Sequence, residues 1–416
     1  MKMMEMKMME MNVYIRMILS IGFLSLLLTF TITNPRGRHE QDNFSFLTST
    51  LSSSSVSMAS LQDSLSGNGK SKDLEYDFYR DSCPDAQQIV RSKMVEAYSH
   101  HKDISAALLR LFFHDCFVHG CDASVLLDDS HGNRRYSTEK QAVPNKSLRG
   151  FDTIDMIKEE IERVCPGIVS CADIISLATR DGIILAGGPF YPVFTGRRDS
   201  IRSYYEDVLN EIPNPDDNIT RILHLFLLKG FNERETVSLL GGHNIGKMSC
   251  EFIENRLYNF RGTGKPDPTI AADFLNKIRL KCEGDNNSRV RNGLFESMDS
   301  EATNLQELAS SLSSGEGFDT HYYQGLLMGQ GLLFADQQLM AEEKTARLVR
   351  AYASDDGSTF RLDFAEAMVK MSNLGVLTGS QGEFMEVMCV SPFSYWIDYT
   401  GNTGLPCIVV VRAARM

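Results

Sequence analysis

The sequence predicts a mainly α-helical domain whose loops are tied by disulfides. Apolar residues recur at helical spacing in several segments, whereas the alternating apolar and polar runs that indicate strands are scarce. The nine cysteines include no CxxC pair, so disulfides in an oxidising compartment fit them better than a zinc site. With 42 Lys+Arg against 54 Asp+Glu the net charge is -12, which argues against nucleic acid or an anionic membrane as the main partner. A small substrate fits this charge better.

The first 33 residues predict entry into the secretory pathway, either as a signal peptide or as a signal anchor. Met17 to Thr33 is uncharged and mostly apolar, with basic residues on both sides. No small-x-small cleavage site follows directly, and the run is close to the roughly 17-residue lower limit for crossing a bilayer. We therefore expect a secreted protein, with anchoring through residues 13–33 as the alternative.

Residues 34–73 predict a flexible stem, because serine, glycine, asparagine and threonine dominate there. We expect the folded domain to run from Leu74 to Cys389, followed by a tail, residues 390–416, to which we assign no function. Asn-x-Ser/Thr triplets agree with secretion, although such triplets are frequent by chance. They begin at Asn43, Asn145, Asn218 and Asn286.

Four helices of the domain can be placed in chain order, because their apolar residues stand three and four positions apart. Their apolar members are Phe151, Ile154, Ile157, Ile161 and Val164; then Ile219, Ile222, Leu223 and Phe226; then Leu348, Val349 and Tyr352; then Phe360, Phe364, Ala367, Met368 and Met371. Glycine and proline clusters predict loops between helices at 187–189, 213–215 and 262–268.

The stretch from Arg110 to Ser124 carries the strongest chemical signal. Arg110, Phe113 and His114 stand at i, i+3 and i+4, so in a helix their side chains share one face and can meet over one ligand. His114 can take and return a proton near physiological pH, and Arg110 can stabilise a developing oxyanion. A lone helical histidine is more often structural than catalytic. The neighbouring arginine favours the catalytic interpretation.

Oxygen donors of the kind that calcium prefers follow this helix face. The set comprises the side chains of Asp115, Asp122 and Ser124 and the main-chain carbonyls of Val118 and Gly120. The alternative is a turn pinned by Cys116 and Cys121, and the two interpretations can coexist. We favour calcium, because two carboxylates this close would otherwise repel each other.

A second histidine, His243, follows two glycines. Because glycine lets a large planar group approach the backbone, Gly241 and Gly242 favour an iron ligand at His243. A haem-ligating imidazole usually has its other nitrogen hydrogen-bonded to a carboxylate or carbonyl, and Asp336 is the acid that we assign. An ordinary surface aspartate is the alternative at that position.

Several short motifs lie between about Leu74 and Cys389. Each motif alone is modest evidence for a protein family, but their joint order is highly specific. They are Phe78 to Pro84, Arg110 to Ser124, Thr138 to Asn145, Val169 to Asp173, Gly196 to Ser200, Gly241 to His243, Arg256 to Phe260, Ala335 to Gln337 and Leu377 to Gly379. Together they resemble the secreted plant haem peroxidases of class III. The resemblance implies a two-lobed, mostly helical fold with haem b between a distal and a proximal histidine.

On the distal side, the resemblance implies that His114 is the acid–base that moves the peroxide proton. Arg110 would stabilise the charge that builds as the O–O bond breaks. Asn145 would hydrogen-bond His114, with Glu139 behind it in the same network. Phe113 would contact the cofactor.

On the proximal side, His243 would be the axial ligand of the haem iron and Asp336 its carboxylate partner. Pro213 matches the proline whose carbonyl contacts aromatic donors, and Phe252 would line the haem edge. The implied reaction reduces hydrogen peroxide and oxidises small phenolic donors in one-electron steps. We expect a monomer in the cell wall or apoplast.

The resemblance also implies metal ligands and disulfides. The first calcium set matches the oxygen donors from Asp115 to Ser124. The ligands implied for a second calcium are Asn244, Asp299 and Asp319. This set departs from the family pattern, because Asn244 replaces the usual threonine and a Ser-rich insertion separates the two aspartates. The implied disulfides are Cys83–Cys165, Cys116–Cys121, Cys171–Cys389 and Cys250–Cys282, which leaves Cys407 over.

A second hypothesis is a binding or structural protein that keeps the fold with weak or lost turnover. Asn244 and Met298 motivate it, because Met298 falls where an aromatic residue usually packs on the axial imidazole. A third, a haem-free calcium-binding scaffold, would require the pairing of His114 with His243 to be accidental.

Overall fold

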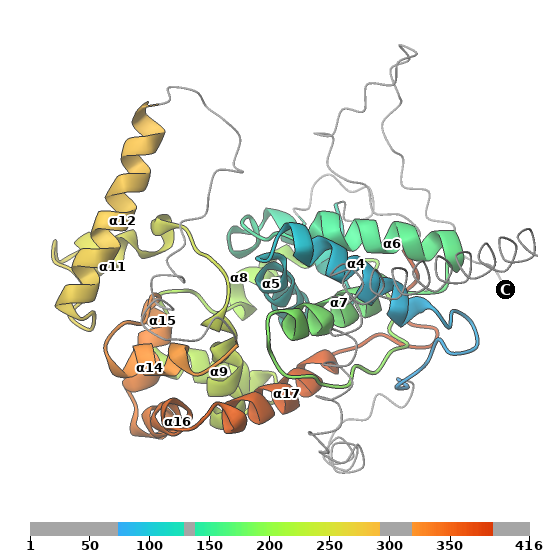
Figure 1. The fold of residues 1–416 in the computed structure, drawn as a ribbon. Helices are drawn as coiled ribbons and strands as arrows, with labels where there is room; N and C mark the ends of the chain where they lie inside the picture. Colours follow the sequence, from blue (N-terminus) through green and yellow to red (C-terminus); the bar gives the residue numbers. More distant parts are fainter. Residues whose placement is uncertain (1–73, 129–137, 292–317, 386–416) are drawn as a thin grey trace, which may run out of the picture. The chain divides into compact units, whose positions relative to one another are not determined.

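The computed structural model describes residues 74–128, 138–291 and 318–385, with the backbone alone for 283–291. Helices dominate these ranges (Figure 1), as the sequence predicts, and the extended segments among them pair only through isolated bridges. The helices are α4 (Ala86–His100), α5 (Ile104–Phe117), α6 (Phe151–Val164), α7 (Cys171–Leu185), α8 (Tyr205–Glu211), α9 (Ile219–Leu228), α10 (Glu233–Leu240), α11 (Glu254–Tyr258), α12 (Ala272–Arg291), α14 (His321–Leu327), α15 (Phe334–Gln337), α16 (Glu343–Ser354) and α17 (Ser358–Ser372).

The four helices predicted from apolar spacing correspond to α6, α9, α16 and α17. Most of the predicted apolar members are buried, and in α17 all of them are, but Val164 at the end of α6 is 52% exposed. One buried position of α6 is a lysine: the Lys158 ammonium pairs with the Glu162 carboxylate at 2.5 Å and donates to the Val169 carbonyl at 2.8 Å, so the buried charge has a counter-charge.

Helices α4, α5, α6 and α7 pack against one another in a first group (Figure 1). The Thr179 hydroxyl of α7 donates to the Leu108 carbonyl of α5 at 3.2 Å. Gly182 allows this close approach, since a Cβ there would lie 3.3 Å from the Ser105 Cα. The packing fixes one face of α5 and leaves the face with Arg110 for other contacts.

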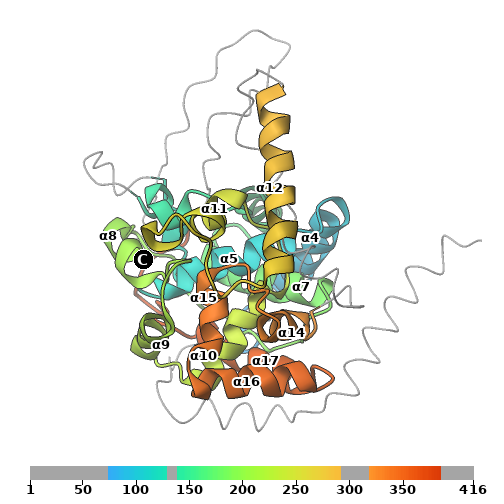
Figure 2. The same cartoon turned by 90° about the vertical axis from the view of Figure 1, so that its left-hand side faces the viewer.

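Helices α10, α14, α16 and α17 form a second group (Figure 2), in which α16 packs against α14 and α10, and α10 packs against α17. Stacked and edge-to-face aromatic rings fill the space between them. The rings are those of Phe318, Tyr323, Tyr352, Phe360 and Phe364. This group contains the segment after α10 that carries His243.

A buried ion pair connects the first group to α17. The Arg197 guanidinium contacts the Asp173 carboxylate at 2.7 Å and also donates to the Ser372 carbonyl at the end of α17. The Tyr79 hydroxyl donates to the other Asp173 oxygen at 2.7 Å. Neither charged side chain is exposed, so the pair depends on these hydrogen bonds.

Three of the four expected disulfides are present, namely Cys83–Cys165, Cys116–Cys121 and Cys250–Cys282. Among the described cysteines Cys171 is a buried thiol, and its expected partner Cys389 lies outside the described residues. The Asp199 carboxylate nevertheless accepts from the backbone N–H groups of both Cys171 and Met385, each at 3.0 Å. The chain therefore comes close to Cys171 only four residues before Cys389.

The described residues belong to one compact unit. The expected signal segment, the stem, the tail and Cys407 lie outside the described ranges, so the domain boundaries stay predictions. In the described part of the chain, no helix has both the length and the apolar character needed to cross a bilayer. The anchoring alternative concerns residues 13–33, which are not among those described.

Candidate active site

Helix α5 presents the expected catalytic face. Leu108, Leu111 and Phe112 are buried, whereas Arg110 and Phe113 on another face are half-buried. His114 lies in the last turn before the helix ends at Phe117. The spacing of i, i+3 and i+4 therefore places the three predicted side chains on one helical face.

The expected bond between His114 and Asn145 is present, at 2.7 Å between Nδ1 and Oδ1. Because an amide oxygen can only accept, Nδ1 carries the proton and Nε2 has the lone pair. Burial and then the charge of Arg110 lower the pKa of His114 to about 3, and the bond to Asn145 opposes this shift. His114 is therefore a neutral base at physiological pH.

The Arg110 guanidinium is held by the same segment. It donates to the Pro144 carbonyl at 2.9 Å and to the Ser147 carbonyl at 3.0 Å. Burial lowers its pKa to about 10, which leaves it charged at neutral pH. Residues 143–147 thus hold both members of the pair, Arg110 and His114. The role of Ser147 was not predicted, since nothing in its local sequence distinguishes it from a surface serine.

Phe113 lies in an aromatic cluster. Its ring centroid is 4.5 Å from that of Phe117 and 6.1 Å from that of Phe226 on α9, and it stands edge-on to His114 at 5.7 Å. These contacts fix the wall beside His114. Contact of Phe113 with a cofactor stays a prediction.

Glu139 is buried near this site but is bonded elsewhere. Its carboxylate accepts from the Tyr204 N–H at 3.0 Å, and its own N–H donates to Ser203. The second Glu139 oxygen and the Asn145 amide nitrogen are both buried without a hydrogen-bond partner. No direct hydrogen bond joins Glu139 to Asn145. The expected hydrogen-bond network from His114 through Asn145 to Glu139 is therefore not formed by direct contacts between these side chains.

His243 has the carboxylate partner that we expected. Its Nδ1 lies 2.7 Å from the Asp336 Oδ1, and 46% of the histidine side chain is exposed, whereas Asp336 is buried. Burial disfavours the charged imidazole, but the charge and hydrogen bond of Asp336 outweigh this and raise the pKa of His243. The interpretation of Asp336 as an ordinary surface residue was wrong.

The glycines before His243 serve packing, which corrects our reason for them. A Cβ at Gly241 would lie 2.3 Å from the Tyr323 hydroxyl, and one at Gly242 would lie 3.2 Å from Leu109. Protein side chains thus occupy the space that we had assigned to a planar group. The contact with Leu109 brings the His243 segment against α5, one residue before Arg110.

Tyr322 is a member of this site that our sequence analysis missed. Its hydroxyl donates to the Asp336 Oδ1 at 2.9 Å, the same oxygen that His243 contacts. Its ring stands edge-on to His243, with the centroids 6.3 Å apart. The two tyrosines at the start of α14 were a signal, but the sequence alone does not show which one faces Asp336.

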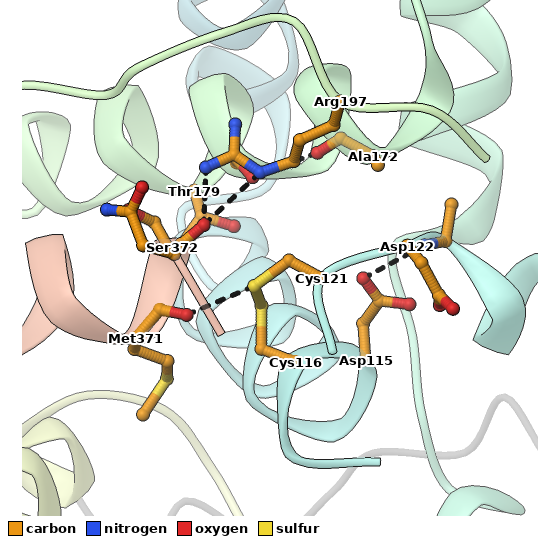
Figure 3. The surroundings of a disulfide bond; sticks show 12 residues. Asp115, Cys116, Cys121, Asp122, Ala172, Thr179, Arg197, Met371 and Ser372 are labelled. Atoms are coloured by element: carbon orange, nitrogen blue, oxygen red, sulfur yellow. Dashed lines mark hydrogen bonds between the residues drawn. A yellow bond between two sulfur atoms is a disulfide. The ribbon is translucent and has the colours of Figure 1, made fainter. Parts of the chain in front are cut away.

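Two of the predicted calcium donors, Asp115 and Asp122, lie beside the Cys116–Cys121 disulfide (Figure 3). Asp115 and Asp122 lie on one side of the bond, and Met371 and Ser372 of α17 lie on the other. The Asp115 carboxylate accepts from the Ala123 N–H at 3.2 Å, and that of Asp122 accepts from the Ser124 N–H at 3.0 Å. The disulfide and the acidic turn thus coexist, as expected.

Oxygens of this turn, and of the short helix Glu139–Gln141 that contacts its end, are buried without a hydrogen-bond partner. They are one Asp115 oxygen, the Ser124 hydroxyl and one Glu139 oxygen. Burial and then the charge of Asp122 raise the pKa of Asp115, and burial raises that of Glu139 to about 8. A bound cation would relieve both effects, so the donor set fits calcium.

The carbonyls of Val118 and Gly120 already accept from the N–H groups of Gly120 and Asp122, and a carbonyl can take a second partner. Within the described ranges, no three His, Cys, Asp or Glu side chains are arranged as a metal site. A cation at this turn would therefore depend on hydroxyl and carbonyl oxygens as well as carboxylates, which is typical of calcium.

The second calcium set is brought together only in part. The Asn244 amide donates to the Asp319 carbonyl, and the Asp319 carboxylate accepts from the N–H groups of His321. Asp299 and Met298 lie outside the described residues. The Asp319 oxygens already accept hydrogen bonds from N–H groups, so this set fits a cation less well than the first. The assignment of a second calcium stays a prediction.

The expected donor-binding proline, Pro213, lies half-buried in the loop between α8 and α9. Phe252 is 43% exposed in the short helix Cys250–Ile253, so its ring is accessible to a ligand. No contact in the structure links either residue to a substrate, and both roles stay predictions.

The two histidines suit a haem iron in complementary ways. The His243 side chain is 46% exposed, and its neutral form has a lone pair on Nε2 when Nδ1 donates to Asp336, as an axial ligand requires. His114 is buried, and its Nδ1 donates to Asn145. The segment that carries His243 packs against α5 through Gly242 and Leu109, next to Arg110 in the sequence. The two histidines therefore fit haem, and the assignment of His243 as the iron ligand stays a prediction.

Comparison with known proteins gives a consistent result. A family model described as peroxidase matches residues 90–355. "Putative Peroxidase 48" of Arabidopsis thaliana is 45% identical over 329 residues, which cover 74% of this chain and 80% of that relative. "Peroxidase 10" of the same plant is 43% identical over 317 residues, covering 76% and 85%. "Peroxidase 49" is 42% identical over 308 residues, covering 74% and 87%.

Proposed function

Because this chain belongs to the peroxidase family, we propose that it reduces hydrogen peroxide with His114 as acid–base and Arg110 as the stabilising cation, and then oxidises phenolic donors. The enzyme is a peroxidase, and its family implies haem and calcium as cofactors in general. One observation supports the proposed roles of the two histidines. Nδ1 of His114 is hydrogen-bonded to Asn145 and Nδ1 of His243 to Asp336, and the segment that carries His243 packs against α5, which carries His114.

Haem, when bound, supplies the iron at which the peroxide O–O bond breaks. His243 would hold that iron through Nε2, since its Nδ1 is bonded to Asp336. His114 would take a proton from one peroxide oxygen and return it to the other oxygen as this leaves as water. The bond to Asn145 supports this role, because it keeps the lone pair on Nε2.

Arg110 would stabilise the negative charge on the leaving oxygen. Its contacts with Pro144 and Ser147 hold the guanidinium beside the Asn145 segment and leave N–H groups over for the peroxide. In the complete reaction one hydrogen peroxide and two phenols become two waters and two phenoxyl radicals. The Pro213 carbonyl would accept a hydrogen bond from each phenol in turn.

Calcium at the Asp115 to Ser124 turn would fix the end of α5, because Asp115 directly follows His114. We further propose that the chain acts outside the cell, in the wall or apoplast, after secretion through residues 1–33. The disulfides Cys83–Cys165, Cys116–Cys121 and Cys250–Cys282 support this compartment.

The test is an absorption spectrum of the purified protein before and after hydrogen peroxide, followed by turnover of the phenol guaiacol. We expect a Soret band that changes on peroxide addition, and a loss of about 10²–10⁴-fold in kcat/KM for peroxide in His114→Ala. His224→Ala, at an exposed histidine of α9, is the matched control and should keep full activity.

Nearly full activity in His114→Ala would contradict the mechanism. Stoichiometric haem without turnover in the unmodified protein would favour the binding-protein hypothesis.

A further inference from the structure

The Asp336 carboxylate receives three hydrogen bonds, and two of them end on one oxygen. His243 Nδ1 lies 2.7 Å from Oδ1, and the Tyr322 hydroxyl lies 2.9 Å from the same atom. Oδ2 accepts from the Leu333 N–H at 3.2 Å, which fixes the carboxylate at the start of α15. Tyr322 and His243 therefore share one acceptor atom.

Tyr322 is well placed to act as a permanent donor. The side chain is buried, and its hydroxyl has the Asp336 oxygen as acceptor at 2.9 Å. Because a phenol ordinarily has a pKa of about 10, the hydroxyl is protonated throughout the physiological range. Its ring, edge-on to the imidazole at 6.3 Å, also restricts the orientation of His243.

We propose that Tyr322 is a positioning residue that sets the electron-donating strength of His243 by sharing its Asp336 oxygen. The inference rests on the proposed role of His243 as the axial iron ligand. It assigns to the Tyr322 hydroxyl a function that neither the chemistry of His114 nor the calcium turn requires.

The direction of the effect follows from the chemistry of the carboxylate. A hydrogen bond to a charged oxygen stabilises its negative charge and lowers its basicity. With Tyr322 in place, Asp336 attracts the Nδ1 proton less strongly, so the imidazole has less imidazolate character. Removal of the hydroxyl should therefore make His243 a stronger donor and favour ferric over ferrous iron.

The experiment compares Tyr322→Phe with Tyr323→Phe in the haem-loaded, full-length enzyme. Tyr323 is the matched control, because it is equally buried in the same helix but its hydroxyl donates to the Val237 carbonyl at 3.0 Å. In Tyr322→Phe we expect a higher Fe–His stretching frequency by resonance Raman of the ferrous protein. We also expect about a tenfold shift of the ferric/ferrous equilibrium toward ferric, which is about 59 mV for a one-electron couple. Tyr323→Phe should show neither change.

A second variant tests the opposite direction. Replacement of Tyr322 alone by 3-fluorotyrosine gives a more acidic hydroxyl, so the Fe–His frequency should fall and the equilibrium should shift toward ferrous. Unchanged spectra and potential in Tyr322→Phe would overturn the inference, and so would equal shifts in Tyr323→Phe. A shift of the same sign in both Tyr322 variants would also overturn it.

If the unmodified protein binds no haem, this inference and the proposed function fail together. If it binds haem and turns over normally, failure of the Tyr322 tests overturns this inference alone.

Discussion

His114 and His243 have the same side chain and opposite pKa shifts. His114 bonds to a neutral amide, so burial and the charge of Arg110 decide the outcome and lower its pKa to about 3. His243 bonds to a carboxylate, whose charge overcomes burial and raises its pKa. The acceptor on Nδ1 thus distinguishes the proposed base, His114, from the proposed iron ligand, His243.

The rate of reaction with peroxide should be insensitive to pH across the ordinary range of histidine. The neutral form of His114 is the base, so the rate should fall only as pH drops toward about 3, the pKa of this residue. Stopped-flow measurement of the peroxide reaction from about pH 8 down to about pH 4.5 should give a nearly flat profile. A decline centred near pH 6.5 would show that His114 titrates as an ordinary histidine.

At the scale of elements, the end of α5 and the acidic turn form one unit. Asp115 in the last turn of α5 and Asp122 in the turn after it are both buried. One carboxylate oxygen of Asp115 has no hydrogen-bond partner. Calcium at this turn should stabilise the fold by about 2.7 kcal/mol when free calcium is about 100 times Kd. The turn would then hold His114 indirectly, through the helix end.

Asp122→Asn should remove one calcium per chain and the stabilisation that calcium gives. Elemental analysis after dialysis, and thermal unfolding with and without added calcium, measure both effects. Asp273→Asn, at an exposed aspartate of α12, is the matched control, and we expect no change in its calcium content. Full retention of calcium in Asp122→Asn, or an equal loss in Asp273→Asn, would contradict a calcium site at this turn.

Without calcium, the same turn should make stability depend on pH. Burial raises the pKa of Glu139 from 4.5 to about 8, so the folded state binds more protons than the unfolded state between these values. This contribution is fully present below about pH 4.5 and is lost as pH rises through about 8. Denaturant unfolding of chelated protein should therefore show lower stability at about pH 9 than at about pH 6. An equal dependence with calcium bound would place Glu139 outside the cation site.

The pair between Asp173 and Arg197 joins α7 to α17, and breaking it should be costly. Asp173→Asn leaves the guanidinium buried without its counter-charge, which should lower the free energy of unfolding by about 3–5 kcal/mol. Denaturant unfolding of the haem-loaded protein measures this. Lys344→Met removes an exposed pair with Glu233 and should change stability by at most about 1 kcal/mol. Equal effects of the two variants would contradict this role of burial.

At the scale of the whole molecule, the disulfides connect fold and compartment. Cys83–Cys165 spans 82 residues and Cys250–Cys282 spans 32, so both restrict the unfolded chain. A cytosolic chain would keep these thiols reduced. Targeting through the first 33 residues should therefore decide whether the domain reaches its stable form.

A chain that lacks residues 1–33 should stay in the cytosol and fail to form its disulfides. Fractionation of cells that express the full and shortened chains, with thiol labelling of each product, tests this. N-terminal sequencing of the exported form separates cleavage from anchoring, since a start near Leu74 would rule out an intact anchor. Export of the shortened chain would show that another segment directs it.

Much of the fold could be predicted, because helical spacing is a local property. Residues 151–164 and 360–371 needed only their own apolar patterns to be placed as α6 and within α17. The buried pair of Asp173 and Arg197 could not be found in this way, because its partners belong to segments that meet only after the helices pack.

The same division holds for the site. The sequence by itself determined the helical face with Arg110 and His114 and the acidic turn after it, because these residues stand in one local motif. The pairing of His243 with Asp336 came from the resemblance to class III peroxidases, because 93 residues separate them. Only the tertiary structure decided that Tyr322 shares an oxygen with His243, that Ser147 holds Arg110, and that Gly241 packs against Tyr323. Such contacts depend on the direction of a side chain across a packed interface, and that direction is set by three-dimensional packing.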